Sequence, residues 1–409
     1  MRIMVALLMF VSFFVLVPPI LSSALAQVKR QVIDTHTHFL PFPPDPKPVS
    51  EATVRRAVQV MDENGIVKAV DLDGGFGTGL KNRIALYKKI APGRIVVFTN
   101  MDSSKINDPQ FSKEAIADLE EASRSGARGL KVFKSLGLVY KDTNGRLIRF
   151  DDPRFDAVWA KCGELGFPVW FHVGDPAAFF RPPTPDNERY AELSVHPEWS
   201  FYGDQFPTRE ELLAQMVSVL LRHPETTFVG VHFGNNPENY RYVAAVLERC
   251  SNFNVDTAAR VGEIGRHDPV KLREFFLKYQ DRILFGSDAV YGPDNVDLGV
   301  PMPGKRTNAD AKAFFDTHWK FFETPARNMD HPSPIQGNWK VNAVNLPAAV
   351  LKKSRKALVM FEGFNYSNKK EYVEWVTEAK GEETRKRRLE TAVAWMAEGK
   401  ARNWKYMRK

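Results

Sequence analysis

The residues best suited to chemistry are histidines and one aspartate that stand where predicted strands end. His36 and His38 form an H-x-H pair at the end of the first predicted strand. Residues i and i+2 of an extended strand face the same way, so both imidazoles can point to one place and bind one ion. His172 and His232 end the fifth and sixth predicted strands, and Asp288 follows the eighth. A buried carboxylate at such a position is costly unless it is paired or bound to a metal.

The elements that would position these side chains alternate between strand and helix from residue 31 onward. This alternation predicts a parallel sheet, and eight strands are the number that closes a (β/α)8 TIM barrel. An open doubly wound sheet is the alternative, but no G-x-G-x-x-G motif follows the first predicted strand. The predicted strands are residues 31–36, 67–72, 95–100, 129–133, 168–172, 227–232, 252–256 and 282–285, and the predicted helices are 51–64, 79–90, 112–125, 154–165, 208–222, 238–249 and 269–279.

A closed barrel makes the first and eighth strands neighbours. We therefore expect Asp288 to lie next to His36 and His38, although they are far apart in the sequence. Imidazoles and a carboxylate together suit Zn²⁺, with Fe²⁺, Mn²⁺ or Co²⁺ as alternatives. Two long connections, residues 173–207 after the fifth strand and residues 289–345 after the eighth, leave the C-terminal ends of strands. Barrels build active sites there, so both connections are candidate lids.

The chain resembles the amidohydrolase superfamily over about residues 31–345, and within it the amidohydrolase-related branch. That branch includes aminocarboxymuconate-semialdehyde decarboxylase and several lactonases and hydratases. The resemblance implies one metal held by His36, His38, His172 and Asp288, with His232 beside it as an acid/base or as the residue that orients the water. The motifs that carry it are Ile33-Asp34-Thr35-His36-Thr37-His38, the strand-end His172, Val231-His232-Phe233-Gly234 and Phe285-Gly286-Ser287-Asp288.

Two basic residues are candidates for substrate binding. In the two-metal branches of the superfamily a carboxylated lysine ends the fourth strand, and Lys131 is close to that position. The resembled branch is normally mononuclear, so we interpret Lys131 first as a substrate-binding or structural residue. Arg260 follows the seventh strand and could bind a substrate carboxylate through two hydrogen bonds, or form a surface salt bridge. The aromatic stretch 199–207 could line an apolar substrate or simply pack the long connection.

The expected reaction is hydrolysis of a small amide, lactone or related carbonyl compound. A bound metal lowers the pKa of water from 15.7 to about 7. His232 or Asp288 would then accept a proton and return it to the leaving group. The same ligands also suit a non-oxidative decarboxylase of a small carboxylic acid. A barrel that binds a small ligand without turnover is a third hypothesis.

The composition is that of a folded globular protein. The 409 residues are 44% hydrophobic and 26% charged, which excludes a disordered chain and a multi-span membrane protein. Two cysteines exclude a disulfide scaffold and a Cys-rich zinc module. Cys162 and Cys250 fall on the fourth and sixth predicted outer helices, so we do not expect a disulfide between them.

The N-terminus has the pattern of a secretory signal. Met1-Arg2 is followed by an uncharged run over residues 3–21 and then by Ser22-Ser23-Ala24-Leu25-Ala26. This pattern predicts cleavage after Ala26 and export to the periplasm or the cell exterior. The alternative is an uncleaved N-terminal membrane anchor, because the run is long enough to span a bilayer.

The C-terminal tail differs from the rest in charge. The net charge is +8, and residues 351–409 carry that surplus with 16 Lys and Arg against 8 Asp and Glu. We therefore divide the chain into a signal (1–26), a barrel (27–350) and a basic helical tail (351–409), with helices at 365–380 and 382–399. The helix that closes the barrel is expected near residues 347–356.

The last part of the tail contains the motifs Lys370-Glu371-Tyr372-Val373-Glu374-Trp375 and Glu383-Thr384-Arg385-Lys386-Arg387-Arg388. With these motifs it resembles the YdeI/OmpD-associated family, which implies a helical appendage with no assigned chemistry. Its charge suits an acidic partner such as anionic lipid, or the tail is a solvated hairpin packed on the barrel. We find no nucleic-acid recognition motif and expect no nucleic acid. The expected partners are thus a small-molecule substrate, an acidic partner and, in a homo-oligomer, further copies of the chain.

Overall fold

The computed structural model describes residues 31–41, 47–102, 105–174, 176–301, 304–348, 350–351, 375–376, 379 and 381–397. The predicted signal and anchor therefore lie outside the described residues. So does most of the predicted helix at 365–380.

Eight parallel strands in the described part of the chain form a closed barrel. Thr99 and Leu130 form a parallel bridge that joins β3 to β4. At the other seam, the carbonyl of Phe285 accepts the amide of Thr35, and the carbonyl of His36 accepts the amide of Asp288, both at 2.9 Å. The predicted (β/α)8 barrel is thus confirmed. Its strands are β1 (Val32–Phe39), β2 (Ile66–Asp71), β3 (Ile95–Val97), β4 (Leu130–Val132), β5 (Val169–Phe171), β6 (Phe228–Gly230), β7 (Phe253–Asp256) and β8 (Ile283–Leu284).

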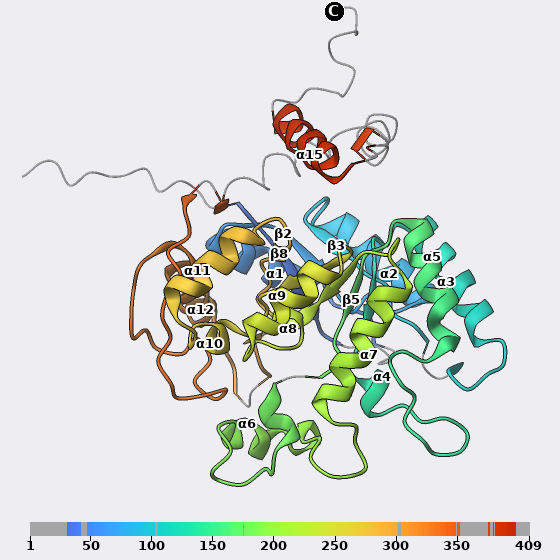
Figure 1. Cartoon of the computed structure of the whole chain (residues 1–409), viewed down its shortest axis with the longest axis horizontal. Coiled ribbons are helices and arrows are strands. Elements are labelled where there is room, and N and C mark those ends of the chain that lie inside the picture. The colour runs from blue at the N-terminus through green and yellow to red at the C-terminus, as the bar shows by residue number, and fades with distance from the viewer. Residues whose placement is uncertain are drawn as a thin grey trace, which may run out of the picture. The chain divides into compact units, whose positions relative to one another are not determined.

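A helix follows each strand of the barrel (Figure 1). The first seven lie close to their predicted ranges, and local capping explains several boundaries. Ser50 caps α1 through the amide of Thr53, and Thr208 and Glu211 form a capping box on α7. The eight helices are α1 (Glu51–Asn64), α2 (Gly77–Ile90), α3 (Phe111–Ser125), α5 (Asp156–Leu165), α7 (Arg209–Arg222), α9 (Tyr240–Arg249), α11 (Pro269–Lys278) and α12 (Asn308–Glu323).

A helix that we did not predict follows β8. The closing helix was expected near residues 347–356, most of which lie outside the described residues. Within the predicted loop 289–345, α12 packs against α1 and closes the ring of helices. Its aromatic face explains the position, because Trp319 packs on Phe285 next to β8 with ring centroids 5.0 Å apart. The same connection also holds β9 (Ala289–Tyr291), which extends the sheet beside β1, and β10 (Val296–Leu298), which pairs antiparallel with β9. The connection therefore contains two strands and a long helix.

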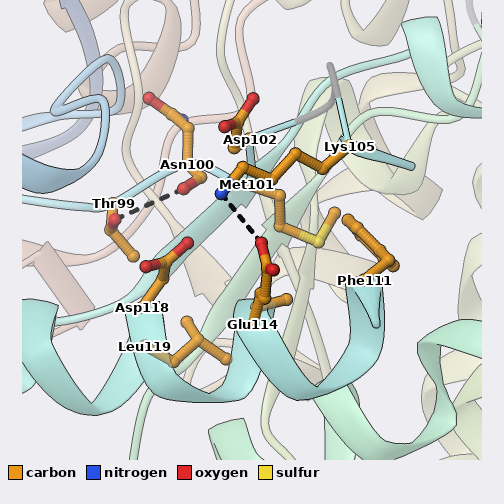
Figure 2. Close-up of a pocket in the computed structure, with 10 residues that line it drawn as sticks. Thr99, Asn100, Met101, Asp102, Lys105, Phe111, Glu114, Asp118 and Leu119 are labelled. Carbon is orange, nitrogen blue, oxygen red and sulfur yellow. Dashed lines mark hydrogen bonds and ion pairs between the residues drawn. The ribbon is translucent and has the colours of Figure 1, made fainter. Parts of the chain in front are cut away.

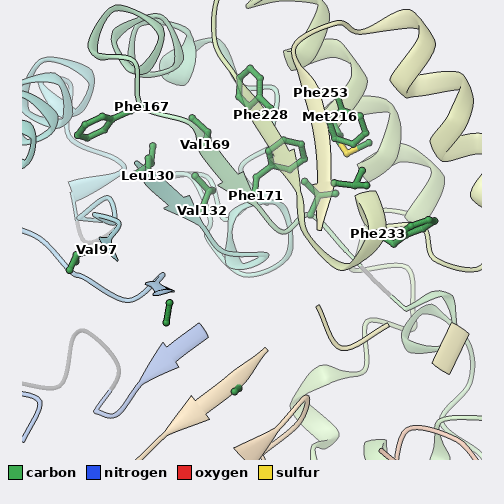
Figure 3. Close-up of a cluster of buried hydrophobic side chains, with 14 of the residues drawn as sticks. Val97, Leu130, Val132, Phe167, Val169, Phe171, Met216, Phe228, Phe233 and Phe253 are labelled. Atoms are coloured by element: carbon green, nitrogen blue, oxygen red, sulfur yellow. The ribbon is translucent and has the colours of Figure 1, made fainter. Parts of the chain in front are cut away.

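Two apolar layers hold the barrel together. Side chains such as Val169 and Phe171 point outward from the strands into the main core beneath the helices (Figure 3). Trp170 lies between them and packs with Phe98 and Val229 in a second cluster that faces the barrel interior. This alternation is the period-two pattern of a strand.

The first long connection, hereafter the β5–α7 loop (residues 173–207), folds over its own aromatic cluster. It contains a 3-10 turn (Ala177–Phe180), α6 (Tyr190–Val195) and a second turn (Pro197–Trp199). Phe201 is buried with Phe179 and Leu193, whereas Tyr202 is exposed. The aromatic stretch 199–207 therefore packs this loop at Phe201, and Tyr202 is left at the surface.

The tail contributes one described helix, α15 (Glu382–Ala397), at the predicted place. Trp395 of this helix stacks on Trp375 at 5.4 Å and 4°, and Arg388 donates to the carbonyl of Trp375 at 2.7 Å. Among the described helices, none combines the length and the apolarity needed to cross a bilayer. Cys162 and Cys250 are both buried and not disulfide-bonded.

Candidate metal centre

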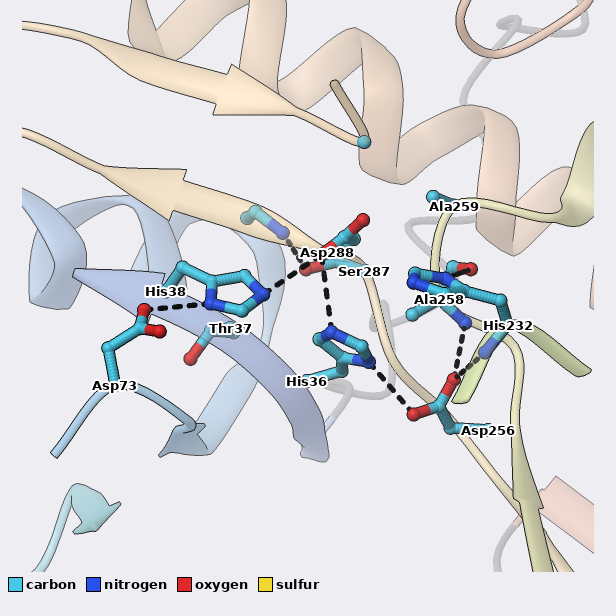
Figure 4. Close-up of polar contacts among 12 residues, drawn as sticks. His36, Thr37, His38, Asp73, His232, Asp256, Ala258, Ala259, Ser287 and Asp288 are labelled. Atoms are coloured by element: carbon cyan, nitrogen blue, oxygen red, sulfur yellow. Dashed lines mark hydrogen bonds and ion pairs between the residues drawn. The ribbon is translucent and has the colours of Figure 1, made fainter. Parts of the chain in front are cut away.

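Three side chains predicted as metal ligands meet at the seam between β1 and β8. Nε2 of His36 lies 3.3 Å from Oδ1 of Asp288, and Nε2 of His38 lies 3.1 Å from the same oxygen (Figure 4). One potential ligand atom from each residue falls within 4.8 Å of the other two. Both histidines are almost fully buried, and the Asp288 side chain is 19% exposed. The cluster is therefore compact enough for one ion and reachable from one side.

The other nitrogen of each imidazole is held by a second carboxylate. Nδ1 of His36 lies 2.9 Å from Asp256, and Nδ1 of His38 lies 2.7 Å from Asp73. Because an ionised carboxylate only accepts, each Nδ1 carries a hydrogen, which leaves Nε2 as the nitrogen that can bind a cation. That is the tautomer and the outer partner that metal-binding histidines usually have.

Burial and neighbouring charges shift the pKa values of the residues in this cluster in opposite directions. Burial alone would raise the pKa of Asp288, but His36, His38 and His232 hold it well below its usual value. Burial alone would lower the pKa of His38, but Asp73 and Asp288 outweigh it and raise that pKa to about 10. Two imidazole nitrogens and a carboxylate oxygen, each ring with an outer acceptor, fit a divalent cation such as Zn²⁺.

The backbone around Asp288 is fixed by β1. Asp34 accepts the amide of Ser287 at 3.0 Å and its hydroxyl at 2.5 Å, and it also accepts the amide of His36. Burial is the main reason that the pKa of Asp34 is raised to about 7, although these hydrogen bonds oppose the rise. Asp288 itself has a φ of 62°, in the left-handed region that non-glycine residues seldom occupy. Such strained positions often lie at functional sites.

His232 lies beside the cluster on a turn of unusual conformation. Its φ is 53°, within the short α8 (Val231–Gly234). Nδ1 of His232 lies 2.9 Å from the carbonyl of Ala258, and its amide donates to Asp256 at 2.9 Å. A carbonyl can only accept, so Nδ1 carries the hydrogen and Nε2 is the basic nitrogen. The ring centroid lies 5.1 Å from that of His36.

His172 occupies a different place from the other predicted ligands. Its ring lies against His232, with centroids 4.5 Å apart, and it is half-buried. It does not belong to the set of ligand atoms that lie within 4.8 Å of one another. Of the four predicted ligands, the structure thus groups three and puts the fourth next to His232.

The two predicted substrate residues are both buried. Lys131 sits in the middle of β4, opposite Trp170 of β5, and its Nζ lies 5.4 Å from the ring centroid of Phe133. Arg260 follows β7, and its Nη1 donates to the carbonyl of Ala259 at 2.8 Å. Arg260 is 5% exposed, so it does not lie at the surface, where we had considered a salt bridge.

Two adjoining pockets lie beside β3 and β4. One is lined by Lys131, Phe133 and Tyr140, among others. The second has Asp118 in its wall and an ion pair between Lys105 and Glu114 (Figure 2). The histidines of the metal cluster line neither pocket.

Sequence reasoning missed the two outer carboxylates. Asp256 ends β7, and Asp73 follows β2 by two residues. Both therefore stand at C-terminal strand ends, where His172, His232 and Asp288 were found. Applying the same positional rule to every strand-end acid would have selected them.

Comparisons with known proteins bear on the fold and the family. No curated protein matches the sequence significantly. Among solved structures, a 2,6-dihydroxybenzoate decarboxylase from Rhizobium is 17% identical over 63% of this chain and 88% of that chain, with a TM-score of 0.39. A 4-oxalomesaconate hydratase from Rhodopseudomonas palustris is 15% identical over 63% and 82%, with a TM-score of 0.40. IDCase from Metarhizium anisopliae is 14% identical over 79% and 97%, with a TM-score of 0.43. At these identities and scores the similarity does not bear on the reaction.

Two family profiles match the sequence, and both resemblances are confirmed. The amidohydrolase profile covers residues 9–316, well over half of the chain. The profile described as bacteriocin-protection, YdeI or OmpD-associated covers residues 344–399. Together with the His-His-Asp cluster, the first match indicates a metal-dependent enzyme that uses a divalent ion. The chain belongs to the amidohydrolase family.

Proposed function

We propose that this protein is a hydrolase that uses one divalent metal, most simply Zn²⁺, on a small amide, lactone or related carbonyl compound. The observation that carries the proposal is the approach of two Nε2 atoms, from His36 and His38, to one oxygen of Asp288. We propose these three residues as metal ligands and His172 as the fourth. The outer bonds from Asp256 and Asp73 support this role, because they fix both rings in the ligating tautomer.

The chemistry divides between the ion and the protein. A divalent ion bound there supplies the polarisation that makes a carbonyl more electrophilic and a water more acidic at neutral pH. We propose that Nε2 of His232 accepts the proton of the attacking water and then donates it to the leaving oxygen or nitrogen. The hydrogen bond from its Nδ1 to Ala258 supports this role, because it keeps Nε2 basic. Asp288 is the second proposed proton acceptor.

Substrate recognition is assigned to the two buried cations. Arg260 lies two residues after Ala258 and therefore close in the chain to the carbonyl that holds His232. We propose that it binds a carboxylate or another anionic group of the substrate. Lys131 lines a small pocket with Phe133 and Tyr140, and we propose that its ammonium group contacts the substrate.

We also propose the division of the chain into a signal cleaved after Ala26, a barrel to residue 350 and a tail from residue 351. Cleavage would place the mature protein in the periplasm or outside the cell. Arg385, Lys386 and Arg387 are exposed on α15, which supports an acidic partner for the tail. Mass spectrometry of the exported protein tests the cleavage site directly.

The experiment that tests the reaction combines metal analysis with product analysis. The full chain is loaded with Zn²⁺, dialysed and incubated with a panel of lactones, anilides and aromatic carboxylic acids. We expect about one equivalent of zinc and a new carboxyl group in a lactone or amide product. The variants His36→Ala and Asp288→Asn should lose both the bound zinc and the hydrolysis. The control His223→Ala, which changes a histidine that bonds Asp156, should lose neither of them.

Other outcomes contradict specific parts of the proposal. Release of CO₂ from an acid, with no hydrolysis of any panel member, would replace hydrolysis by decarboxylation. Binding of a panel member without turnover and without metal would leave only a ligand-binding barrel. About two equivalents of zinc, with one lost on Lys131→Met, would make Lys131 part of a two-metal site.

A further inference from the structure

A buried ion pair ties the β5–α7 loop to the segment that follows β7. Arg189 precedes α6 and is 1% exposed. It donates to Glu192 at 2.5 Å and forms a second ion pair with Glu263, which is 2% exposed. Burial alone would raise the pKa of Glu263, but Arg189 and Arg260 outweigh it and lower the pKa below its usual value. Glu263 is therefore a buried anion that depends on its cationic neighbours.

Glu263 stands in the same short segment that orients His232. The segment begins at Asp256, which accepts the amide of His232, and continues to Ala258, whose carbonyl accepts its Nδ1–H. Five residues further on, Glu263 lies on α10 (Val261–Ile264). Only Ala259 and Arg260 separate that carbonyl from the start of α10, so a displacement of α10 can be transmitted to it.

The segment that holds His331 and Trp339 packs against α10. The ring of His331 packs on the backbone of Gly262, where an added Cβ would lie 1.9 Å from Nε2. Trp339 donates from its indole nitrogen to the carbonyl of Gly262 at 3.0 Å. The close contact with His331 and the bond from Trp339 leave Gly262 little room to move toward that side.

We infer that Arg189 is a positioning residue for His232. By pairing with Glu263 it fixes α10, and through α10 it fixes the carbonyl of Ala258 that receives the Nδ1 hydrogen. Removing Arg189 takes away the strongest cationic neighbour of the buried Glu263 and leaves Arg260 to compensate it, which favours movement of the segment toward water. The role of His232 as a proton carrier rests on the proposed function, but the orientation of its ring is measurable without any reaction.

The test reads the tautomer of His232 in the metal-free full chain. Histidine is labelled with ¹⁵N, ring nitrogens are correlated with ring protons at alkaline pH, and His232→Asn assigns the signal. We expect the Nδ1–H form in the native protein and a loss of that form as the dominant species in Arg189→Met. Arg189→Lys keeps the charge but replaces the guanidinium, whose two Nη atoms bond Glu192 and Glu263 separately, by a single ammonium, so it should shift the signal in the same direction and by less. Unchanged His318 signals show that the barrel is folded.

A second anchor of the same loop provides the matched control. Nζ of Lys134 lies 5.2 to 5.4 Å from the ring centroids of Phe179, Trp199 and Phe201. Lys134→Met therefore loosens the β5–α7 loop without unpairing Glu263, and we expect its His232 signal to match the native one.

Two results would overturn the inference. One is an unchanged His232 signal in folded Arg189→Met or, if that variant does not fold, in Arg189→Lys. The other is an equal change in Lys134→Met, which would mean that any loosening of the loop suffices. Failure to find hydrolysis would change neither of these two His232 measurements, so the inference and the proposed function can fail separately.

Discussion

Asp256 and His36, 220 residues apart in the sequence, share a hydrogen bond of 2.9 Å between two buried side chains. The second oxygen of the same carboxylate accepts the amide of His232. One aspartate at the end of β7 thus orients a proposed ligand and a proposed proton carrier together. This relationship makes Asp256 the residue whose replacement should be most informative.

We expect Asp256→Asn to weaken zinc binding by roughly 10- to 100-fold, the usual effect of removing an outer carboxylate from a metal-binding histidine. An amide can also donate to Nδ1 and so favours the tautomer in which Nε2 carries the hydrogen. Competition with a coloured chelator measures the affinity. Asp281→Asn, at an exposed position before β8, is the control and should bind zinc like the native chain. Equal zinc affinities of the Asp256→Asn and Asp281→Asn variants would show that Asp256 does not support a metal ligand.

Gly262→Ala should destabilise the protein, because its Cβ would lie 1.9 Å from Nε2 of His331. Overpacking of this kind costs about 1–3 kcal/mol of unfolding free energy. Gly79→Ala on α2 is the control, since nothing lies within 4 Å of its Cβ, and it should be neutral or stabilise by up to about 1 kcal/mol. Urea unfolding measures both. His331→Ala should relieve most of the cost in the double variant, and a cost that persists there would contradict a clash at this contact.

Acid should destabilise the barrel through His318. Burial lowers the pKa of this residue from 6.5 to about 4. Below pH 6.5 the unfolded chain binds a proton that the folded chain does not, so the free energy of unfolding falls by roughly 3 kcal/mol by about pH 4. His318→Phe should remove this part of the decline. The pKa of His331 is also lowered to about 4, so the pH dependence should be reduced and not abolished. Identical pH profiles of native and variant unfolding would refute the prediction.

Lys131→Met should retain about one equivalent of zinc. If Lys131 binds substrate, the variant should lose roughly 10- to 100-fold in kcat/KM, the effect of one charged hydrogen bond. Elemental analysis and steady-state kinetics on the same preparation separate the two effects. A loss of metal would instead assign the lysine to the metal site.

The barrel could be predicted from the sequence because the patterns that indicate its strands and helices are local. Each strand is a short β-branched run, and each helix has an amphipathic pattern between turn residues. The sequence did not predict α12, because this helix lies in a long connection rich in aromatic residues, although Thr307 and Asp310 form a capping box at its start.

The sequence did not predict those parts of the site that depend on distances between side chains. A strand-end position tells which end of the barrel a side chain occupies, and this sufficed to bring His36, His38 and Asp288 into one group. It could not show that His172 lies against His232, because that depends on side-chain directions and backbone turns. The pairing of Arg189 with Glu263 joins two loops, and no spacing rule connects them.

The central claim is that the imidazoles of His36, His38 and His172 and the carboxylate of Asp288 bind a single divalent ion. Zinc K-edge X-ray absorption on the zinc-loaded full chain tests it most directly. We predict a shell of nitrogen and oxygen ligands at about 2.0–2.1 Å with the outer scattering of imidazole, absent from His36→Ala and Asp288→Asn. Failure of the native chain to bind zinc, or the same spectrum from both variants, would contradict the claim.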